Sequence, residues 1–180
     1  MTDTTLLHPG DSFPELTVAL SGGRSLQLPG ALAGHFGVLL FYRGSWCPYC
    51  NAQLSAFQRS RDGLAALGVS VVALSVDDEA TTQNLIAKHG LQFPVGHGAD
   101  TDAVAGITGA FVNPDPLFLQ STGFVLDPAG RVVVSVYSSG AIGRLVPQDV
   151  IGLVRYLREH ARPASEPRVC WLARVVAHRG

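Results

Sequence analysis

The stretch FYRGSWCPYCNAQL, residues 41–54, places two cysteines, Cys47 and Cys50, three positions apart. An apolar run, residues 37–42, leads into it, and a segment with helical periodicity begins at Pro48. A continuous apolar run of this length is typical of a strand that is buried on both faces of a sheet. The sequence therefore predicts a strand that leads directly into a helix, with both thiols at the junction.

The segments on either side alternate between strand-like and helix-like patterns. Alternation of this kind predicts a parallel core, and a late hairpin adds antiparallel strands. We expect an α/β protein with a mixed central sheet, helices on both faces and an extra N-terminal hairpin. The expected order is a hairpin (16–20 and 24–28), a strand (37–42), a helix (48–67), a strand (69–76), a helix (79–89), a short strand and loop (93–100), a short helix (101–107), a break at NPDP (113–116), a second hairpin (123–127 and 131–137) and a closing helix (148–161).

A length of 180 residues suits one domain with a sizeable core. We predict a single domain over residues 1–180, in which residues 163–180 form a C-terminal extension. Within that extension, the run VCWLARVVA (169–177) is apolar enough to pack against another surface, such as a neighbouring subunit.

The overall charge and the lack of a long apolar run exclude several classes of partner. Thirteen basic and fourteen acidic residues give a net charge of −1, which does not favour nucleic acid. The longest apolar run, residues 36–42, is too short to span a bilayer. The N-terminus lacks the features of a secretory signal, so we expect a cytoplasmic protein that does not associate with membranes.

The position of the two thiols predicts different chemistry for each. Pro48 suits the first position of a helix, which makes Cys47 the N-cap. The Cys47 sulfur can then accept backbone N–H groups of the first turn, and the helix dipole favours its thiolate. We expect Cys47 to have a lowered pKa and to be the attacking sulfur. Cys50, one turn further on, should be less exposed and should act as the resolving thiol.

Two alternatives to a redox pair were weighed. A tetrahedral zinc site needs about four ligands, and the chain has no second C-x-x-C and no histidine pair at ligand spacing. We therefore expect no metal and no other cofactor. Two inert buried cysteines remain an alternative. The third cysteine, Cys170, is most simply a buried apolar thiol, with a distant resolving role as its alternative.

The motif WCPYC after an apolar strand resembles the active site of the thioredoxin superfamily. Four blocks in order are similar to the redoxin branch of peroxiredoxins and alkyl hydroperoxide reductases, the thiol-specific antioxidant group. The resemblance covers roughly residues 9–156 and implies a thioredoxin-like fold and thiol-dependent redox activity. The four blocks are FYRGSWCPYCNAQL, VVALSVDD, FPVGHGAD and GFVLDPAGRV.

The chain departs from the resembling families at three positions. Peroxiredoxins have Thr or Ser three residues before the attacking cysteine and Pro four residues earlier, where this chain has Gly44 and Leu40. They also have an Arg at the position of Ser121. Since the hydroxyl and the guanidinium would hold the peroxide, we expect Arg43 and Ser45, beside the cysteines, to substitute for them.

Thioredoxins, in turn, have a buried Asp at the position of Phe41 and a cis-proline at the position of Ser121. Proton removal from Cys50 must therefore use another group. We expect Trp46 to pack beside the site and to shape the surface on which partners dock, with simple core packing as its alternative.

The residues favour three functions. The first is a thiol peroxidase, in which Cys47 becomes a sulfenic acid that Cys50 resolves. The second is a thiol–disulfide oxidoreductase acting on protein or small-molecule disulfides. The third is a redox sensor without turnover. The resemblance implies a peroxide or disulfide substrate, a thioredoxin-like or small-thiol reductant, and association as a homodimer.

Overall fold

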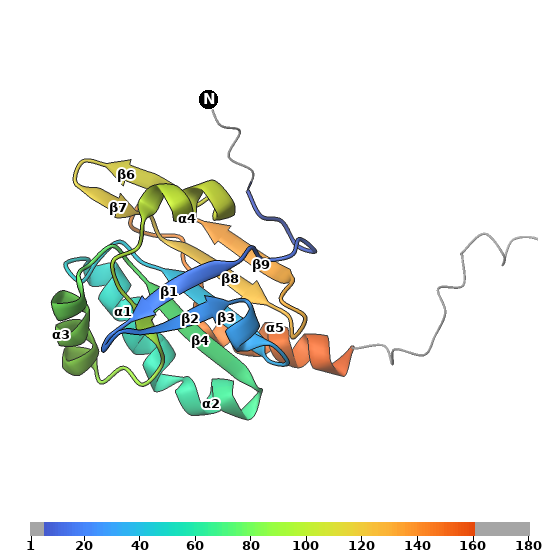
Figure 1. The fold of residues 1–180 in the computed structure, drawn as a ribbon. Helices are drawn as coiled ribbons and strands as arrows, with labels where there is room; N and C mark the ends of the chain where they lie inside the picture. The colour runs from blue at the N-terminus through green and yellow to red at the C-terminus, as the bar shows by residue number, and fades with distance from the viewer. Residues whose placement is uncertain (1–5, 161–180) are drawn as a thin grey trace, which may run out of the picture.

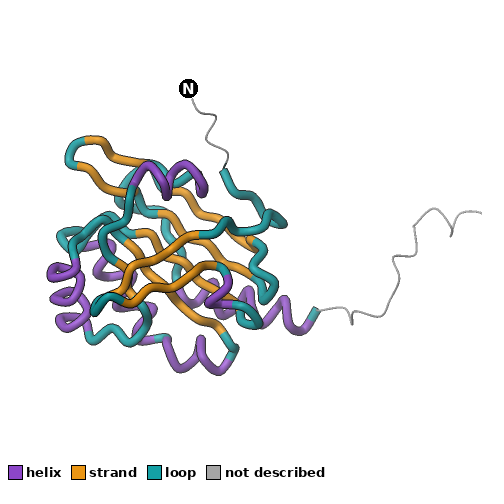
Figure 2. Tube along the Cα trace, in the orientation of Figure 1, coloured by secondary structure: helices purple, strands orange, loops and turns teal. Residues whose placement is uncertain are grey.

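A computed structural model describes residues 6–160 of the chain, and a mixed five-stranded sheet lies at its centre (Figures 1 and 2). The strand order is β5-β4-β3-β8-β9. Strands β3, β4 and β5 run parallel to one another, and β8 and β9 add antiparallel neighbours. The strands are β3 (Phe36–Phe41), β4 (Val69–Leu74), β5 (Val95–Gly96), β8 (Thr122–Leu126) and β9 (Val132–Tyr137).

The central strand β3 is buried along its whole length, as the apolar run predicts. It pairs with β4 on one side, where Phe41 lies opposite Leu74, and with β8 on the other, where Phe41 lies opposite Thr122. Because β3 ends at Phe41, the loop that carries Cys47 leaves the sheet at the carboxyl end of β3 and β4. Ligand and catalytic groups of α/β proteins commonly gather at this edge.

One face of the sheet is covered by helices, whose apolar side chains form the larger core cluster with β3 and β4. Leu54, Phe57 and Leu64 enter this cluster from the two helices that follow Cys47, and Val150 and Val154 enter it from the last helix. The helices that contribute to this face are α1 (Pro48–Arg59), α2 (Arg61–Ala66), α3 (Glu79–His89) and α5 (Pro147–Glu159).

The opposite face is covered by the N-terminal hairpin and one helix (Figure 1). Val18 and Leu28 of the hairpin and Val104 of the helix pack there on Leu39 and Phe124. The predicted α/β fold with an extra N-terminal hairpin is therefore confirmed. The elements on this face are β1 (Leu16–Leu20), β2 (Arg24–Leu28), the short 3-10 helix η1 (Gly30–Leu32) and α4 (Thr101–Thr108).

A further hairpin, which the sequence did not predict, lies around the NPDP segment. Strands β6 (Val112–Pro114) and β7 (Leu117–Leu119) pair in antiparallel fashion across it. Pattern analysis recognised the prolines only as a break, since strands this short carry no periodicity that can be read. The hairpin brings Phe118 over the loop that carries the cysteines.

The helix predicted over residues 48–67 is wrong in one respect, because it is interrupted at Ser60 and forms α1 and α2. Phe57 and Leu64, which are buried in the same cluster, are separated by six residues that are not buried. No buried apolar side chain therefore holds the backbone around Ser60 in a helical conformation against the sheet. The other predicted elements are present with ends shifted by a few residues.

Two further predictions concern the chain as a whole. The C-terminal extension, residues 163–180, lies outside the described residues, so the assignment of a single domain over 1–180 stays a prediction. Among the helices within residues 6–160, none has both the length and the apolar character needed to cross a bilayer.

Replacing Phe124 by alanine is expected to destabilise the fold strongly. Phe124 is fully buried, and its ring contacts those of Phe13, Phe41 and Tyr137 at centroid distances of 5.3–5.8 Å. Loss of a buried aromatic ring costs about 3–5 kcal/mol, measurable as a shift in urea unfolding. Phe111→Ala, at a position that is 42% exposed, is the matched control and should cost much less. Equal losses for the two variants would contradict this placement of the core.

Candidate active site

Cys47 is the N-cap of α1, as the sequence predicts. Its backbone is extended, Pro48 occupies the first helical position, and the Cys50 N–H donates to the Cys47 sulfur at 3.4 Å. The Cys47 N–H donates to the Gly44 carbonyl at 3.1 Å, which fixes the approach of the loop. The sulfur therefore lies at the end of the helix where unpaired N–H groups favour negative charge.

Both sulfurs are buried and reduced. Cys50 is fully buried, and its sulfur accepts the Arg43 N–H at 3.4 Å. Cys47 is 1% exposed and Cys50 is 0% exposed, so Cys50 is the less exposed thiol, as expected, but by a small margin. Side chains from distant segments contact the first turn and bury both sulfurs.

Both sulfurs are contacted by the side chain of Arg144, from the loop between β9 and α5. Its Nη2 lies 3.4 Å from the Cys50 sulfur and 3.8 Å from the Cys47 sulfur. One guanidinium nitrogen therefore donates to both thiols. Since arginine stays protonated at any relevant pH, this places a permanent positive charge against the pair.

The guanidinium of Arg144 is held in place on its other side. Its Nη1 donates to Ser121 Oγ at 2.6 Å and to Gln53 Oε1 at 3.1 Å, and its Nε donates to the Ala141 carbonyl at 3.0 Å. Gln53 also donates from Nε2 to the Leu145 carbonyl at 2.9 Å, which ties the loop to α1. The guanidinium thus has a fixed orientation toward the sulfurs.

Arg43, which the sequence analysis placed beside Cys47, points elsewhere. Its guanidinium carbon lies 4.9 Å from the Trp46 ring centroid and 4.8 Å from that of Phe118. Cation–π contacts of this kind hold the side chain between two aromatic rings. Arg43 therefore acts on the thiols through its backbone N–H and, at longer range, through its charge.

Trp46 lies beside the cysteines and remains 56% exposed, with its ring in an edge-to-face contact with Phe118 at 5.2 Å. Tyr49, between the two cysteines, is 54% exposed. Aromatic side chains therefore form the outer surface of the site while the sulfurs lie beneath it.

Ser45 contributes to the loop rather than to the sulfurs. Its N–H donates to Asp77 Oδ2 at 2.7 Å, and its carbonyl accepts Asn51 Nδ2 at 2.9 Å. Asp77 follows β4, so this bond connects the end of one strand to the loop after its neighbour. The neighbouring Asp78 caps α3 through the Thr81 N–H at 2.7 Å.

The glycine three residues before Cys47 occupies a position where a side chain has no room. Gly44 has a φ of +149°, and a Cβ on it would lie 2.4 Å from Trp46 Nε1 and 3.1 Å from Asp77 Oδ1. The threonine or serine of the resembling families therefore cannot be accommodated here without moving Trp46.

The two thiols have opposite pKa shifts. Burial acts to raise the pKa of Cys47, but hydrogen bonds from the Cys50 thiol and N–H and the charges of Arg144 and Arg43 outweigh it, so this pKa lies below its ordinary value. Burial and the hydrogen bond to Cys47 raise the pKa of Cys50 to about 11, against the influence of Arg144. Cys47 is therefore the thiol of the pair that ionises more readily.

Buried hydroxyls lie on the inner side of the site. Those of Tyr42 and Thr82 have no hydrogen-bond partner among the described residues. Burial chiefly, with the charge of Asp77 nearby, raises the pKa of Tyr42 to about 12. The tyrosine therefore stays neutral beside Cys50.

Sequence reasoning found Cys47, Cys50 and Pro48 but missed Arg144 and Gln53. Arg144 stands alone in a glycine-containing loop, 97 residues after Cys47, so no spacing could connect the two. Gln53 gave a weak signal, because it is a polar residue on the buried face of α1. Within residues 6–160, no three side chains of the His, Cys, Asp or Glu type lie together as a metal site would need.

A thioredoxin-like sheet with a capped thiolate and an adjacent buried thiol defines a thiol oxidoreductase. Comparison with known proteins identifies the family within this class to which the chain belongs. Residues 9–135 match the AhpC/TSA family. The chain belongs to this family, and it is a peroxiredoxin-like enzyme.

Individual relatives are distant but cover most of the chain. A peroxiredoxin of Treponema denticola is 28% identical over 153 residues, 83% of this chain and 73% of its own. The thiol-disulfide oxidoreductase ResA of Bacillus thuringiensis is 28% identical over 136 residues, covering 74% and 72%. The solved structure of peroxidoxin BcpB from Mycobacterium tuberculosis is similar in fold, with a TM-score of 0.73 at 20% identity, over 84% of this chain and 99% of that one.

Titration should separate the two thiols. In a Cys170→Ser background, thiolate absorbance should rise in two steps, one below the ordinary thiol value of about 8.5 and one near 11. Arg144→Met removes the positive charge that favours both thiolates, so both steps should move to higher pH. Arg155→Met, on the exposed side of α5, is the control and should move neither. A single step at the ordinary value would contradict the assignment.

Proposed function

We propose that the protein reduces peroxides, with Cys47 as the attacking thiolate and Cys50 as the resolving thiol. The observation that carries the proposal is the Arg144 guanidinium, which lies against both sulfurs and is fixed by Gln53 and Ser121. A preorganised positive charge at the sulfur stabilises both the thiolate and the negative charge that develops on the peroxide oxygens.

In the first step, the Cys47 thiolate attacks one oxygen of the peroxide. A sulfur–oxygen bond forms, the oxygen–oxygen bond breaks, and the second oxygen leaves as alkoxide or hydroxide and takes up a proton. Cys47 is thereby oxidised to sulfenic acid while the peroxide is reduced to an alcohol or water. Nη2 of Arg144 is the donor placed to stabilise the oxygen that carries the negative charge.

In the second step, Cys50 loses its proton and attacks the Cys47 sulfur. A disulfide forms, and the hydroxyl group of the sulfenic acid leaves with a proton as water. Because burial raises the pKa of Cys50 to about 11, its thiol is protonated before this step. An external thioredoxin-like dithiol or a small thiol then reduces the disulfide and completes the cycle.

The burial of Cys47 favours a small substrate. The sulfur is only 1% exposed, so a peroxide approaches it after small side-chain movements. A protein disulfide is much larger and requires the covering side chains to be displaced. For this reason the proposal ranks peroxide above disulfide as the oxidising substrate.

A thiol–disulfide oxidoreductase is the second candidate, and the exposed aromatic surface favours it. Trp46 and Tyr49, each more than half exposed, flank the cysteines in the way that suits docking of a partner protein. In the peroxidase proposal, the same surface serves the reductant that reopens the Cys47–Cys50 disulfide.

The proposal also includes a cytoplasmic location and association as a homodimer. A reducing compartment suits an enzyme whose cycle begins with two free thiols. Homodimer formation rests on the family resemblance alone, and a mass measurement in solution tests it.

Rapid mixing of the reduced protein with hydrogen peroxide tests the peroxidase. Sulfenic acid should form on Cys47 much faster than on free cysteine. Arg144→Met should slow this step by about 100-fold or more, because an oriented charge-stabilising donor is lost. Arg155→Met, the matched control, should keep the normal rate. A rate near that of free cysteine in the wild-type protein would refute the proposal in favour of disulfide exchange.

Single cysteine variants test the division of labour. Cys50→Ser should accumulate sulfenic acid on Cys47 and stop after one turnover, which mass spectrometry with a sulfenate-specific reagent detects. Cys47→Ser should consume no peroxide above background. Continued turnover of Cys50→Ser that is lost when Cys170 is also replaced by serine would mean that Cys170 resolves the sulfenic acid, whereas turnover that persists would mean that the donor thiol attacks it directly.

A further inference from the structure

The outer edge of strand β4 has a neighbouring strand only at its carboxyl end. Strand β5 pairs with β4 only at Ala73 and Leu74. The Ala73 N–H donates to the Pro94 carbonyl across this edge. The N–H and C=O groups of alternate residues in a strand point to the same side. Those of Val69 and Val71 therefore point to this outer edge, as the Ala73 N–H does. Within residues 6–160, no strand lies beside them.

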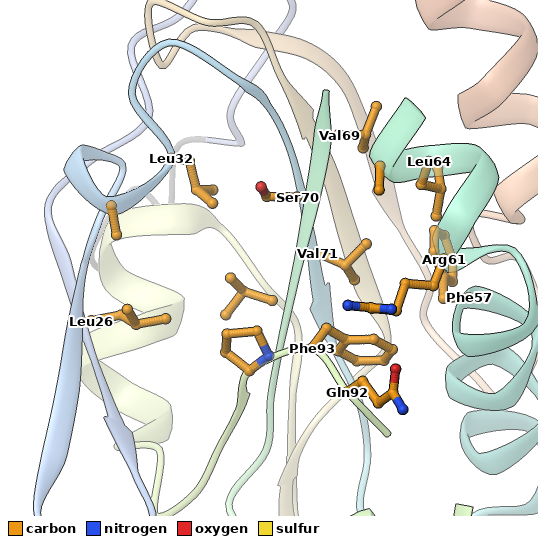
Figure 3. A pocket seen from close by; sticks show the side chains of 14 residues that line it. Leu26, Leu32, Phe57, Arg61, Leu64, Val69, Ser70, Val71, Gln92 and Phe93 are labelled. Atoms are coloured by element: carbon orange, nitrogen blue, oxygen red, sulfur yellow. The ribbon is translucent and has the colours of Figure 1, made fainter. Parts of the chain in front are cut away.

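This open edge forms the floor of an apolar groove of about 270 Å³ (Figure 3). One wall comes from the N-terminal hairpin and η1, including Leu26 and Leu32. The other wall comes from α1 and α2, including Phe57 and Leu64. Phe93 lies at the end of the groove where β5 begins.

An open strand edge between two mainly apolar walls, to which Arg61 adds one charged side chain, fits an added strand better than it fits a helix or a small molecule. Unpaired N–H and C=O groups along an edge are a template for another extended segment. In such an added strand, alternate side chains point to opposite faces, here toward the two apolar walls.

The described chain ends close to this groove. Helix α5 packs against α2, which forms one wall. Near the end of α5, the guanidinium of Arg158 lies 3.0 Å from the position that a Cβ would take on Gly68, the residue directly before β4. Helix α5 therefore ends near the start of β4, where the open edge begins.

We propose that residues 169–177, VCWLARVVA, dock in this groove as an additional strand beside Val69–Val72. The segment is rich in valine and carries Trp171, residue types that favour strands. Eight of its nine residues are apolar, which matches the lining of the groove. The nine steps along the chain from residue 160 to residue 169 span up to about 30 Å when extended, and α5 ends near the start of β4.

Docking at this place gives Cys170 a defined position. The groove runs along Val69–Val72 on the outer edge of β4, whereas the cysteine pair lies beyond the end of the neighbouring strand β3. Cys170 then lies in a different part of the molecule from Cys47, and we expect it not to resolve the sulfenic acid. The C-terminal segment thus covers a sheet edge and takes no part in the thiol chemistry.

Paired variants of α2 in the full-length chain test the proposal. Ala65 is exposed and lines the groove, and the adjacent Ala66 is exposed but does not line it. Ala65→Glu places a charge in the groove and should release the segment, whereas Ala66→Glu should not. Both variants change the same residue type in the same helix, so any general effect on stability is shared.

Two measurements report docking. In a Trp46→Phe background, Trp171 is the single tryptophan, and its fluorescence should be blue-shifted and protected from acrylamide. Ala65→Glu should remove both effects and Ala66→Glu should keep them. Hydrogen exchange at the Val71 amide should accelerate by at least about tenfold in Ala65→Glu alone.

The alternatives give different results. A Trp171 that is solvent-exposed in the wild-type protein, or a Val71 amide that exchanges rapidly there, overturns the proposal. Protection that disappears on dilution to a monomer also overturns it, because the groove would then be filled by a second copy of the chain. Protection that persists in the monomer and is lost only in Ala65→Glu supports it.

Discussion

The site depends on one interaction, the donation from a single guanidinium nitrogen of Arg144 to both sulfurs. Burying a thiolate costs free energy unless opposite charge or hydrogen bonds compensate for it. Cys47 is almost completely buried, and its pKa nevertheless lies below the ordinary value. The Cys50 thiol and its N–H each donate to this sulfur, and Arg144 adds a fixed positive charge from outside the helix.

The position of Arg144 also explains how the chain differs from its relatives. Where the resembling peroxiredoxins have an arginine, this chain has Ser121, and the Arg144 guanidinium donates to that serine. In this chain, the positive charge beside the sulfurs therefore comes from the loop between β9 and α5. The missing threonine has a separate cause, since Trp46 and Asp77 leave no room for a side chain at Gly44.

Local features of the site could be read from the sequence, whereas its long-range contacts could not. The N-cap at Cys47 and the strand before it follow from neighbouring residues, and so does the Asp78 cap of α3. Arg144 and Gln53 meet only because the loop after β9 folds back over α1. Arg43 was assigned by proximity in sequence, but two aromatic rings, one of them from the unpredicted β6–β7 hairpin, draw its guanidinium away.

Arg144 is one of the residues that attach the loop between β9 and α5 to the rest of the molecule, and two of the atoms that hold its side chain, the two sulfurs, change in the proposed oxidation. A disulfide carries no negative charge and is a weak hydrogen-bond acceptor, so the loop is held more tightly when both cysteines are reduced. Whatever favours the dithiol over the disulfide raises the reduction potential of the pair. The same arginine therefore makes the oxidised protein easier to reduce, which returns it readily to the form that begins the cycle.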